Sequence, residues 1–323
     1  MIEARGLTKR YGATLAVDDL SFTVRPGTVT GFLGPNGAGK TTTMRMILGL
    51  DSPTAGTVTI GGRPHRDLPR PMRQVGALLE ARAVHGGRTA RSHLLCLAQT
   101  NGISRRRVDQ VLELVGLAEV ARRRSRAFSL GMAQRLGIAA ALLGDPAVLM
   151  FDEPVNGLDP EGITWIRTLM QSLAGEGRTV LVSSHLMAEM ENTAAHLLVI
   201  GRGRLIADCS MAAFMGRSSA RAVLVRTPQP AELAGAVAAA GGTVTRPPDD
   251  EAGTGAADGD SGDALQVRGL TQDQVADLAF ARGIQLRHLA AARVSLEQAF
   301  MELTADSVEY HAGRTTAGAG TEA

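Results

Sequence analysis

A glycine-rich stretch at residues 34–42 constrains this chain more than any other feature of its sequence. It reads GPNGAGKTT, and a glycine followed after four residues by Gly-Lys-Thr is the spacing of a phosphate-binding loop. The apolar run at 29–33 before it predicts a buried strand, and residues 41–49 after it predict a helix that ends at a glycine. A strand, a glycine turn and a helix start point successive backbone N–H groups at one place, where the helix dipole also favours anions. The stretch therefore predicts a nucleotide-binding α/β protein.

Every residue of this loop is a candidate ATP ligand: Gly34, Pro35, Asn36, Gly37, Ala38, Gly39, Lys40, Thr41 and Thr42. The glycines let the backbone close around phosphate oxygens without a clash at Cβ. Lys40 can reach the β- and γ-phosphates, and the hydroxyl of Thr41 can ligate Mg²⁺. The chain has arginine at every other basic position except Lys9, and a lysine suits a site that needs a compact point charge.

Two adjacent carboxylates follow the apolar run at 147–151. Such a run predicts a central parallel strand, whose carboxyl end is where ligands bind in open α/β sheets. Asp152 at that end suits Mg²⁺, and Glu153 suits activation of a water aimed at the γ-phosphate. A second buried strand at 179–184 ends in His185, which can reach phosphate from the same edge. We expect Glu153 and His185 to be catalytic.

Composition narrows the class of protein. A net charge of +2 gives no case for nucleic acid, and the arginine runs at 105–107 and 122–124 flank a helical pattern as solvated faces would. Cys96 and Cys209 lack metal-type spacing, so a reducing, cytoplasmic compartment is expected. The N-terminus does not have the pattern of a signal peptide, and no apolar run reaches the length of a membrane span. A membrane role would therefore need a partner.

The remaining pattern predicts three regions. Residues 1–60 alternate as strands do, whereas 72–145 carry helical patterns. Residues 218–305 predict a small α+β domain with strands at 221–225 and 265–267 and helices at 272–281 and 295–303. The acidic, glycine-rich segment 247–263 and the tail 306–323 are expected to be disordered.

Several motifs follow one another along the chain: an aromatic at Tyr11, the loop 34–42, Phe-Ser-Leu-Gly-Met at 128–132, the carboxylate strand at 148–153, Asn-Gly-Leu-Asp at 156–159, and His185. From the residues alone, Tyr11 is open to two interpretations, packing or base stacking, and Ser129 could be only a helix N-cap. The set resembles the ATP-binding subunit of ABC transporters over about residues 2–215.

The resemblance implies an α/β P-loop NTPase fold: a RecA-like parallel sheet core, an antiparallel β subdomain and a helical subdomain inserted at about 72–145. A cassette at 1–215 would precede the C-terminal α+β domain at 218–305. Tyr11 would stack on adenine, and Asp159 would join Glu153 and His185 as catalytic. The signature residues Ser129, Leu130, Gly131 and Met132 would contact the nucleotide of a second copy.

Two motifs depart from the family pattern: the signature and the position of Glu80. The signature usually reads Leu-Ser-Gly-Gly-Gln, so Ser129 and Gly131 are retained while Leu130 and Met132 differ. Glu80 stands where the family has a glutamine; it is a candidate ATP and metal ligand beside Thr41 and Asp152, although it cannot donate as an amide does. Both departures resemble the export branch that includes bacitracin-resistance and daunorubicin-type drug-resistance ATPases.

The resemblance implies an ATPase that uses ATP and Mg²⁺ and pairs with a second copy of itself. It would drive a separate multi-span membrane permease, docked near residues 80–85, from the cytoplasmic face of the membrane, and would export a drug, an antibiotic or another hydrophobic substrate. Two alternatives stay open. The chain could regulate or confer immunity without pumping, or it could be a soluble ABC ATPase acting on nucleic acid or ribosomes, although no nucleic-acid partner is expected.

Overall fold

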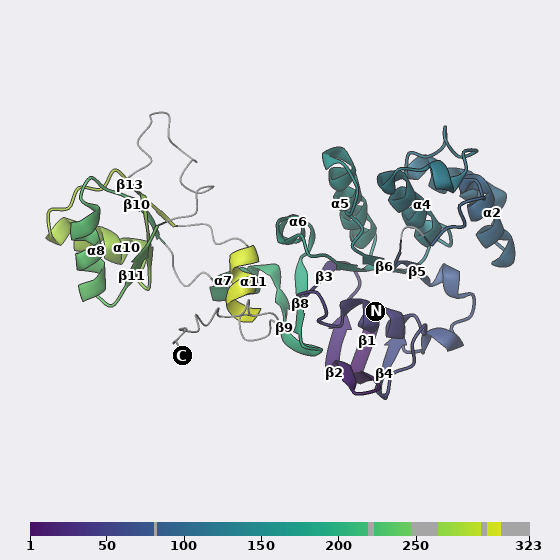
Figure 1. Ribbon diagram of the computed structural model, residues 1–323, viewed down its shortest axis with the longest axis horizontal. Coiled ribbons are helices and arrows are strands. Elements are labelled where there is room, and N and C mark those ends of the chain that lie inside the picture. The colour runs from purple at the N-terminus through teal and green to yellow at the C-terminus, as the bar shows by residue number, and fades with distance from the viewer. Residues whose placement is uncertain (81–82, 219–222, 247–263, 292–295, 305–323) are drawn as a thin grey trace, which may run out of the picture. The chain divides into compact units, whose positions relative to one another are not determined.

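The protein forms two compact units. The computed structural model describes residues 1–80, 83–218, 223–246, 264–291 and 296–304 (Figure 1). The first unit contains Met1–Met211 and the second Ala212–Leu303. The expected domain boundary at 215–218 stays a prediction. The segments expected to be disordered, 247–263 and 306–323, lie outside the described residues.

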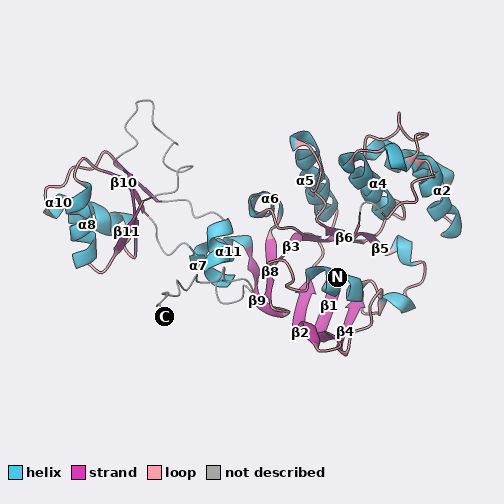
Figure 2. Ribbon diagram, viewed as in Figure 1, coloured by secondary structure: helices cyan, strands magenta, loops and turns pink. Residues whose placement is uncertain are grey.

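The first unit contains both strands and helices (Figure 2). Its strands are β1 (Ile2–Tyr11), β2 (Thr14–Val24), β3 (Val29–Leu33), β4 (Ala55–Ile60), β5 (Val75–Leu78), β6 (Val148–Asp152), β7 (Thr179–Ser183), β8 (His196–Gly201) and β9 (Arg204–Ser210). Its helices are α1 (Lys40–Ile47), α2 (Ala90–Thr100), α3 (Arg105–Leu114), α4 (Leu130–Leu142), α5 (Pro160–Gly175) and α6 (Met187–Thr193). Alternation holds only after residue 148: β1, β2 and β3 come before any helix, and α2, α3 and α4 follow one another, which agrees with the predicted strand-rich start and helical insertion.

A six-stranded sheet in the order β5-β6-β7-β3-β8-β9 forms the centre of this unit. All neighbouring pairs are parallel except β8 and β9, which form an antiparallel hairpin. Every residue of β3 and β7 is buried, which is why both strands read as continuous apolar runs rather than as alternating ones. The carboxyl ends of β3, β6 and β7 consequently meet at one edge, since Phe32 and Asp152 both pair with Ser183.

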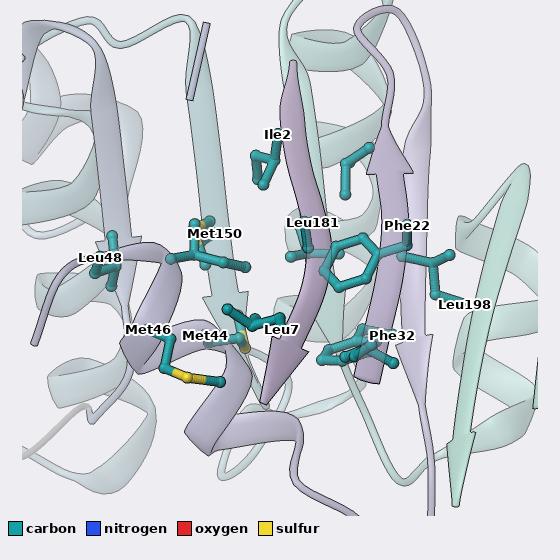
Figure 3. Packing of buried hydrophobic residues seen from close by; sticks show 14 of the residues in the cluster. Ile2, Leu7, Phe22, Phe32, Met44, Met46, Leu48, Met150, Leu181 and Leu198 are labelled. Atoms are coloured by element: carbon teal, nitrogen blue, oxygen red, sulfur yellow. The ribbon is translucent and has the colours of Figure 1, made fainter. Parts of the chain in front are cut away.

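A second, antiparallel sheet in the order β2-β1-β4 packs across the core from the main sheet. Ile2, Leu7 and Phe22 of this sheet are buried against side chains of α1 and of the parallel strands, among them Met44, Met150 and Leu181 (Figure 3). The helices α5 and α6 contact β3 from the other side. The main sheet is therefore covered on both faces, as a parallel sheet requires.

The helical insertion packs on the main sheet through α4. The helices α2, α3 and α4 contact one another, and α4 also packs along β5. The approach of α4 to β5 is so close that a Cβ at Gly76 would lie 1.9 Å from the carbonyl oxygen of Ala141. Glycine at this position is therefore a packing requirement.

The second unit is a β-α-β-β-α-β arrangement. Its elements are β10 (Val223–Arg226), α8 (Pro230–Ala239), β11 (Thr243–Thr245), β12 (Ala264–Arg268), α10 (Gln272–Ala281) and β13 (His288–Ala291), with α7 (Met211–Ser218) before them and α11 (Leu296–Thr304) after them. The antiparallel sheet has the order β11-β12-β10-β13, and its core contains Val223, Val225, Leu233 and Val267. The sequence predicted the α+β class and the helix at Gln272–Ala281, but it missed α8, β11 and β13.

No helix within the described residues is long and apolar enough to cross a membrane.

The glycine at position 76 provides a test of the packing between α4 and β5. We expect Gly76→Ala to lower the free energy of unfolding by at least about 1–3 kcal/mol, because the added methyl would collide with backbone rather than with a flexible side chain. Gly175→Ala is the matched control: its Cβ would meet nothing within 4 Å, and alanine favours the helix. Urea denaturation followed by the fluorescence of the single tryptophan, Trp165, measures both variants. Equal stability of the two variants would contradict the packing argument.

Candidate functional site

The phosphate loop connects β3 to α1 and depends on its glycines. Gly39 is the N-cap of α1 and has φ +99°, a conformation that other residues rarely adopt. A Cβ at Gly39 would also lie 2.5 Å from the carbonyl oxygen of Ala16, and one at Gly34 would lie 2.5 Å from that of Ile200. The loop is thus pressed against two neighbouring segments, and its backbone N–H groups remain at the start of α1, where an anion is favoured.

Lys40 lies over the same loop. Its Nζ donates hydrogen bonds to the carbonyl oxygens of Gly34 at 2.6 Å and Pro35 at 3.3 Å, and the side chain is buried. Burial lowers the pKa of Lys40, while Glu153 and Asp152 act in the opposite direction. The positive charge is therefore held in a poorly solvated place, where it would interact strongly with phosphate.

Asp152 joins the ends of two parallel strands to α1. Its Oδ2 accepts a hydrogen bond from the hydroxyl of Thr41 at 2.8 Å, and its Oδ1 accepts one from the hydroxyl of Ser183. The expected metal pair, Thr41 and Asp152, is thus in direct contact. Ser183 was missed as a member of the site, although its place at the end of β7 could have indicated it.

The donors around Asp152 fit Mg²⁺. They are hydroxyl and carboxylate oxygens, which this ion prefers. No group of three or more His, Cys, Asp or Glu side chains that could hold a metal occurs among the described residues. A site of one carboxylate and one hydroxyl is typical of Mg²⁺ shared with substrate phosphates rather than held by protein alone.

Glu153 and His185 face each other at the same edge. Oε2 of Glu153 lies 2.8 Å from Nδ1 of His185 and accepts the backbone N–H of His185 at 3.3 Å. Glu153 has φ +50°, and four hydrogen bonds hold its backbone. Its N–H donates to the carbonyl and hydroxyl oxygens of Ser183, and its carbonyl oxygen accepts from Nε2 of Gln134 and from the N–H of Asn156. This unusual backbone conformation is therefore well supported.

Lys40, Asp152 and Glu153 line a cleft of about 600 Å³. Ser183 and the predicted catalytic His185 are not among the described residues that line it. The predicted site residues that line it are Asn36, Gly37, Ala38, Gly39, Lys40, Thr41, Thr42, Glu80, Leu130, Asp152 and Glu153. Ala16, Leu79, Gln134 and Asn156 line it as well. Gln134 was missed, although it lies one helical turn after Leu130 and so on the same face of α4.

Several predicted residues are not among the described residues that line this cleft. Ser129 is the N-cap of α4 and accepts the backbone N–H of Met132 at 3.2 Å, which confirms it as a cap. Asp159 is the N-cap of α5 and accepts the N–H of Gly162 at 2.9 Å. Tyr11, at the end of β1, donates a hydrogen bond to Asp51 at 2.9 Å. Their roles toward a nucleotide stay predictions.

The signature segment packs on the loop that follows β6 in the same chain. A Cβ added at Gly157 would lie 2.3 Å from Cγ of Leu130, so the leucine side chain occupies that space. A Cβ added at Gly131 would lie 2.8 Å from the carbonyl oxygen of Gly157. The leucine that departs from the family pattern is thus accommodated by a glycine opposite. Leu130 is nevertheless 41% exposed, so part of its side chain faces outward.

Comparisons with known proteins agree with this geometry. A sequence profile of the ABC transporter family matches residues 17–156, and one of a domain family of unknown function matches residues 221–297. The bacitracin transport ATP-binding protein BcrA of Bacillus licheniformis is 44% identical over 211 residues, which cover 64% of this chain and 69% of the relative. The chain belongs to the ABC transporter family. It is of the ATP-binding subunit type, as the resemblance predicted.

Other relatives extend this ABC assignment. The lantibiotic transport ATP-binding protein SrtF of Streptococcus pyogenes is 36% identical over 210 residues, covering 64% of this chain and 90% of the relative. A solved ATP-binding subunit of an ABC transporter is 29% identical with a TM-score of 0.62, covering 67% of this chain and 92% of the other. A dimeric ATP-binding cassette bound to ADP and Pi has a TM-score of 0.60 at 24% identity, over 65% of this chain and 99% of the other, which shows the shared fold. The predicted fold class and export branch are confirmed.

The contacts of Glu153 generate a prediction for hydrolysis. We expect Glu153→Gln to keep ATP binding and to lower turnover by about 10²–10⁴, because glutamine preserves the shape of the side chain but cannot accept a proton as a general base. Phosphate release and equilibrium ATP binding measure the two quantities separately. Undiminished turnover would contradict the role of Glu153 as the base.

Proposed function

We propose that this ABC protein binds and hydrolyses ATP with Mg²⁺ and so powers export through a separate membrane permease. The observation that carries this proposal is the convergence of Lys40, Thr41, Asp152 and Glu153 around one cleft. A cation, a hydroxyl and two carboxylates at the carboxyl edge of a parallel sheet are the groups that phosphoryl transfer needs.

The proposed reaction is the attack of water on the γ-phosphorus of ATP. Glu153 accepts a proton from the water as the new P–O bond forms, and the bond from the γ-phosphorus to the bridging oxygen breaks to give ADP and phosphate. His185, held against the carboxylate of Glu153, orients it and contacts the γ-phosphate. Lys40 and the loop N–H groups hold the phosphates in line.

Thr41 and Asp152 would hold Mg²⁺, which when bound neutralises charge on the phosphate oxygens. Glu80 lines the same cleft and would add a carboxylate oxygen, directly or through water. A carboxylate in place of the usual amide suits a cation or a water, and we propose this role for Glu80.

We propose that a second copy of the chain completes each site. One isologous interface between two copies completes both sites at once. Ser129 at the start of α4 would then contact the γ-phosphate of the partner copy's ATP, with Leu130, Gly131 and Met132 beside it and Asp159 near the attacking water. The shared fold of the dimeric cassette and the partial exposure of Leu130 support this arrangement.

The permease is proposed to be a separate multi-span protein, with this chain bound at the cytoplasmic face of the membrane. Val84 of the expected docking segment at 80–85 lines a hollow of about 350 Å³, together with Gly86, Ser125, Arg126, Phe128, Ala133 and Leu136. Relatives named for bacitracin transport, lantibiotic transport and Nod factor export support export of a drug, an antibiotic or another hydrophobic substrate.

Co-expression with the membrane protein encoded beside this chain tests the transport half of the proposal. We expect the two to purify as a complex whose ATPase activity rises with substrate and drives flux in vesicles. The reason is that the association of the two ATP-bound copies would be coupled to the permease. The Glu153→Gln complex is the control and should assemble without flux. ATP hydrolysis without flux would instead favour a regulatory or immunity role.

A further inference from the structure

The ring of Tyr11 is held by groups outside the phosphate site. Its hydroxyl donates to Oδ2 of Asp51 at 2.9 Å, and Nζ of Lys9 lies 4.8 Å from the ring centroid. The side chain is 46% exposed, so without these contacts the ring would be free to change rotamer. These two independent contacts restrict the orientation of an exposed aromatic ring, which indicates that the orientation is needed for binding.

The group that holds Tyr11 is itself anchored to α1. Nε of Arg45, in the last turn of α1, donates to the same Oδ2 of Asp51 at 2.7 Å. The backbone N–H groups of Leu50 and Asp51 donate to the carbonyl oxygen of Arg45 at 2.9 and 3.4 Å. The position of the ring is therefore set by the helix whose first residues form the phosphate site.

Lys9 closes this arrangement from the side of β1. Its ammonium donates to the carbonyl oxygen of Ser52 at 2.7 Å, so the charge is fixed over the ring by the segment that follows α1. A cation over one face of an aromatic ring is stabilised there by the ring quadrupole. One face of Tyr11 is thus covered by Lys9, and a flat ligand would stack on the other.

Tyr11 does not itself line the cleft, but its hydroxyl interacts with Thr42, which does. Burial raises the pKa of the Tyr11 hydroxyl and the hydrogen bond to Asp51 raises it further, whereas Arg45 and the hydroxyl of Thr42 lower it. The pKa of Tyr11 is raised on balance, which favours the neutral hydroxyl that donates to Asp51.

We infer that Asp51 is a positioning residue for the nucleotide base, which fixes the ring of Tyr11 so that its open face stacks on the base of a nucleotide whose phosphates lie in the loop. A base that stacks on a ring already in place does not pay the entropy of ordering that ring. Aromatic stacking accepts any base by its π-face, so the contribution of Asp51 is to affinity. This inference rests on the proposed function, because it requires the phosphates to be bound by the loop around Lys40.

The test compares two probes on the full chain by calorimetry: Mg-ATP, which has a base, and Mg-tripolyphosphate, which has none. Asp51→Ala is expected to weaken Mg-ATP by about two- to tenfold, the effect of one hydrogen bond. It should leave Mg-tripolyphosphate unchanged, because the phosphate loop is untouched. Asp51→Asn, whose amide oxygen can still accept from Tyr11, should restore most of the affinity for Mg-ATP.

A double-mutant cycle shows whether Asp51 acts through the ring. Tyr11→Phe removes the donor hydroxyl and should cost as much as Asp51→Ala, and in that background Asp51→Ala should have no further effect. Asp67→Ala is the matched control, since the carboxylate of Asp67 is exposed and contacts Arg66 at 3.8 Å. It should bind both probes as the wild type does.

Three results would overturn the inference: no loss of Mg-ATP affinity in Asp51→Ala, an equal loss for both probes, or the same loss in the Tyr11→Phe background. The second would mean that Asp51 only supports α1. A wild-type chain that binds neither probe would overturn the proposed function itself, and this outcome is distinct from the other three.

Discussion

The hydrogen bonds of Asp152 are the interaction on which the site depends. One carboxylate joins Thr41 at the start of α1 to Ser183 at the end of β7, and it lies itself at the end of β6. Parallel pairing places these strand ends at one edge, but pairing alone does not fix the side chains. The two hydroxyl contacts do so, and they set the position of the phosphate loop relative to Glu153, which follows Asp152 directly.

Much of the surrounding structure can be understood as support for two costly features. Lys40 is a buried charge, and the carbonyl oxygens of Gly34 and Pro35 compensate for part of its lost hydration. Glu153 has a backbone conformation that is rare outside glycine, and it is stabilised by hydrogen bonds from its N–H to Ser183 and from Gln134 to its carbonyl oxygen. Both features bring a reactive group to the cleft, and the protein around them is built from ordinary packing between sheets and helices.

The grouping of Lys40, Thr41 and Asp152 could be predicted from the sequence because their motifs depend on local chemistry. A glycine loop before a helix, and two acids after an apolar strand, can each be recognised within about ten residues. The structure brings Lys40, Thr41 and Asp152 together as expected. The contact between Glu153 and His185 joins residues 32 positions apart and could be inferred only from the parallel strands that carry them. The link from Asp51 to Tyr11 has no local signal, because it joins an isolated aspartate to a strand 40 positions earlier.

The second unit contains elements that the sequence pattern does not predict. The helix α8 is rich in alanine and only weakly amphipathic, so it has little periodicity to detect, and β11 has three residues. Their places are set by packing on Val223, Val225 and Val267 rather than by propensity. Glycine 76 is similar: its requirement comes from the backbone of α4, which lies 65 residues further along the chain.

The central claim is that ATP held by one copy is enclosed by the signature segment of a second copy. Light scattering of the Glu153→Gln chain with saturating Mg-ATP measures this most directly, since the variant should retain ATP without hydrolysing it. The account predicts a particle of twice the mass of the 33.8 kDa chain, which returns to the monomer when ATP is removed and does not form in a Lys40→Ala variant. A monomer that stays a monomer with ATP bound would contradict it.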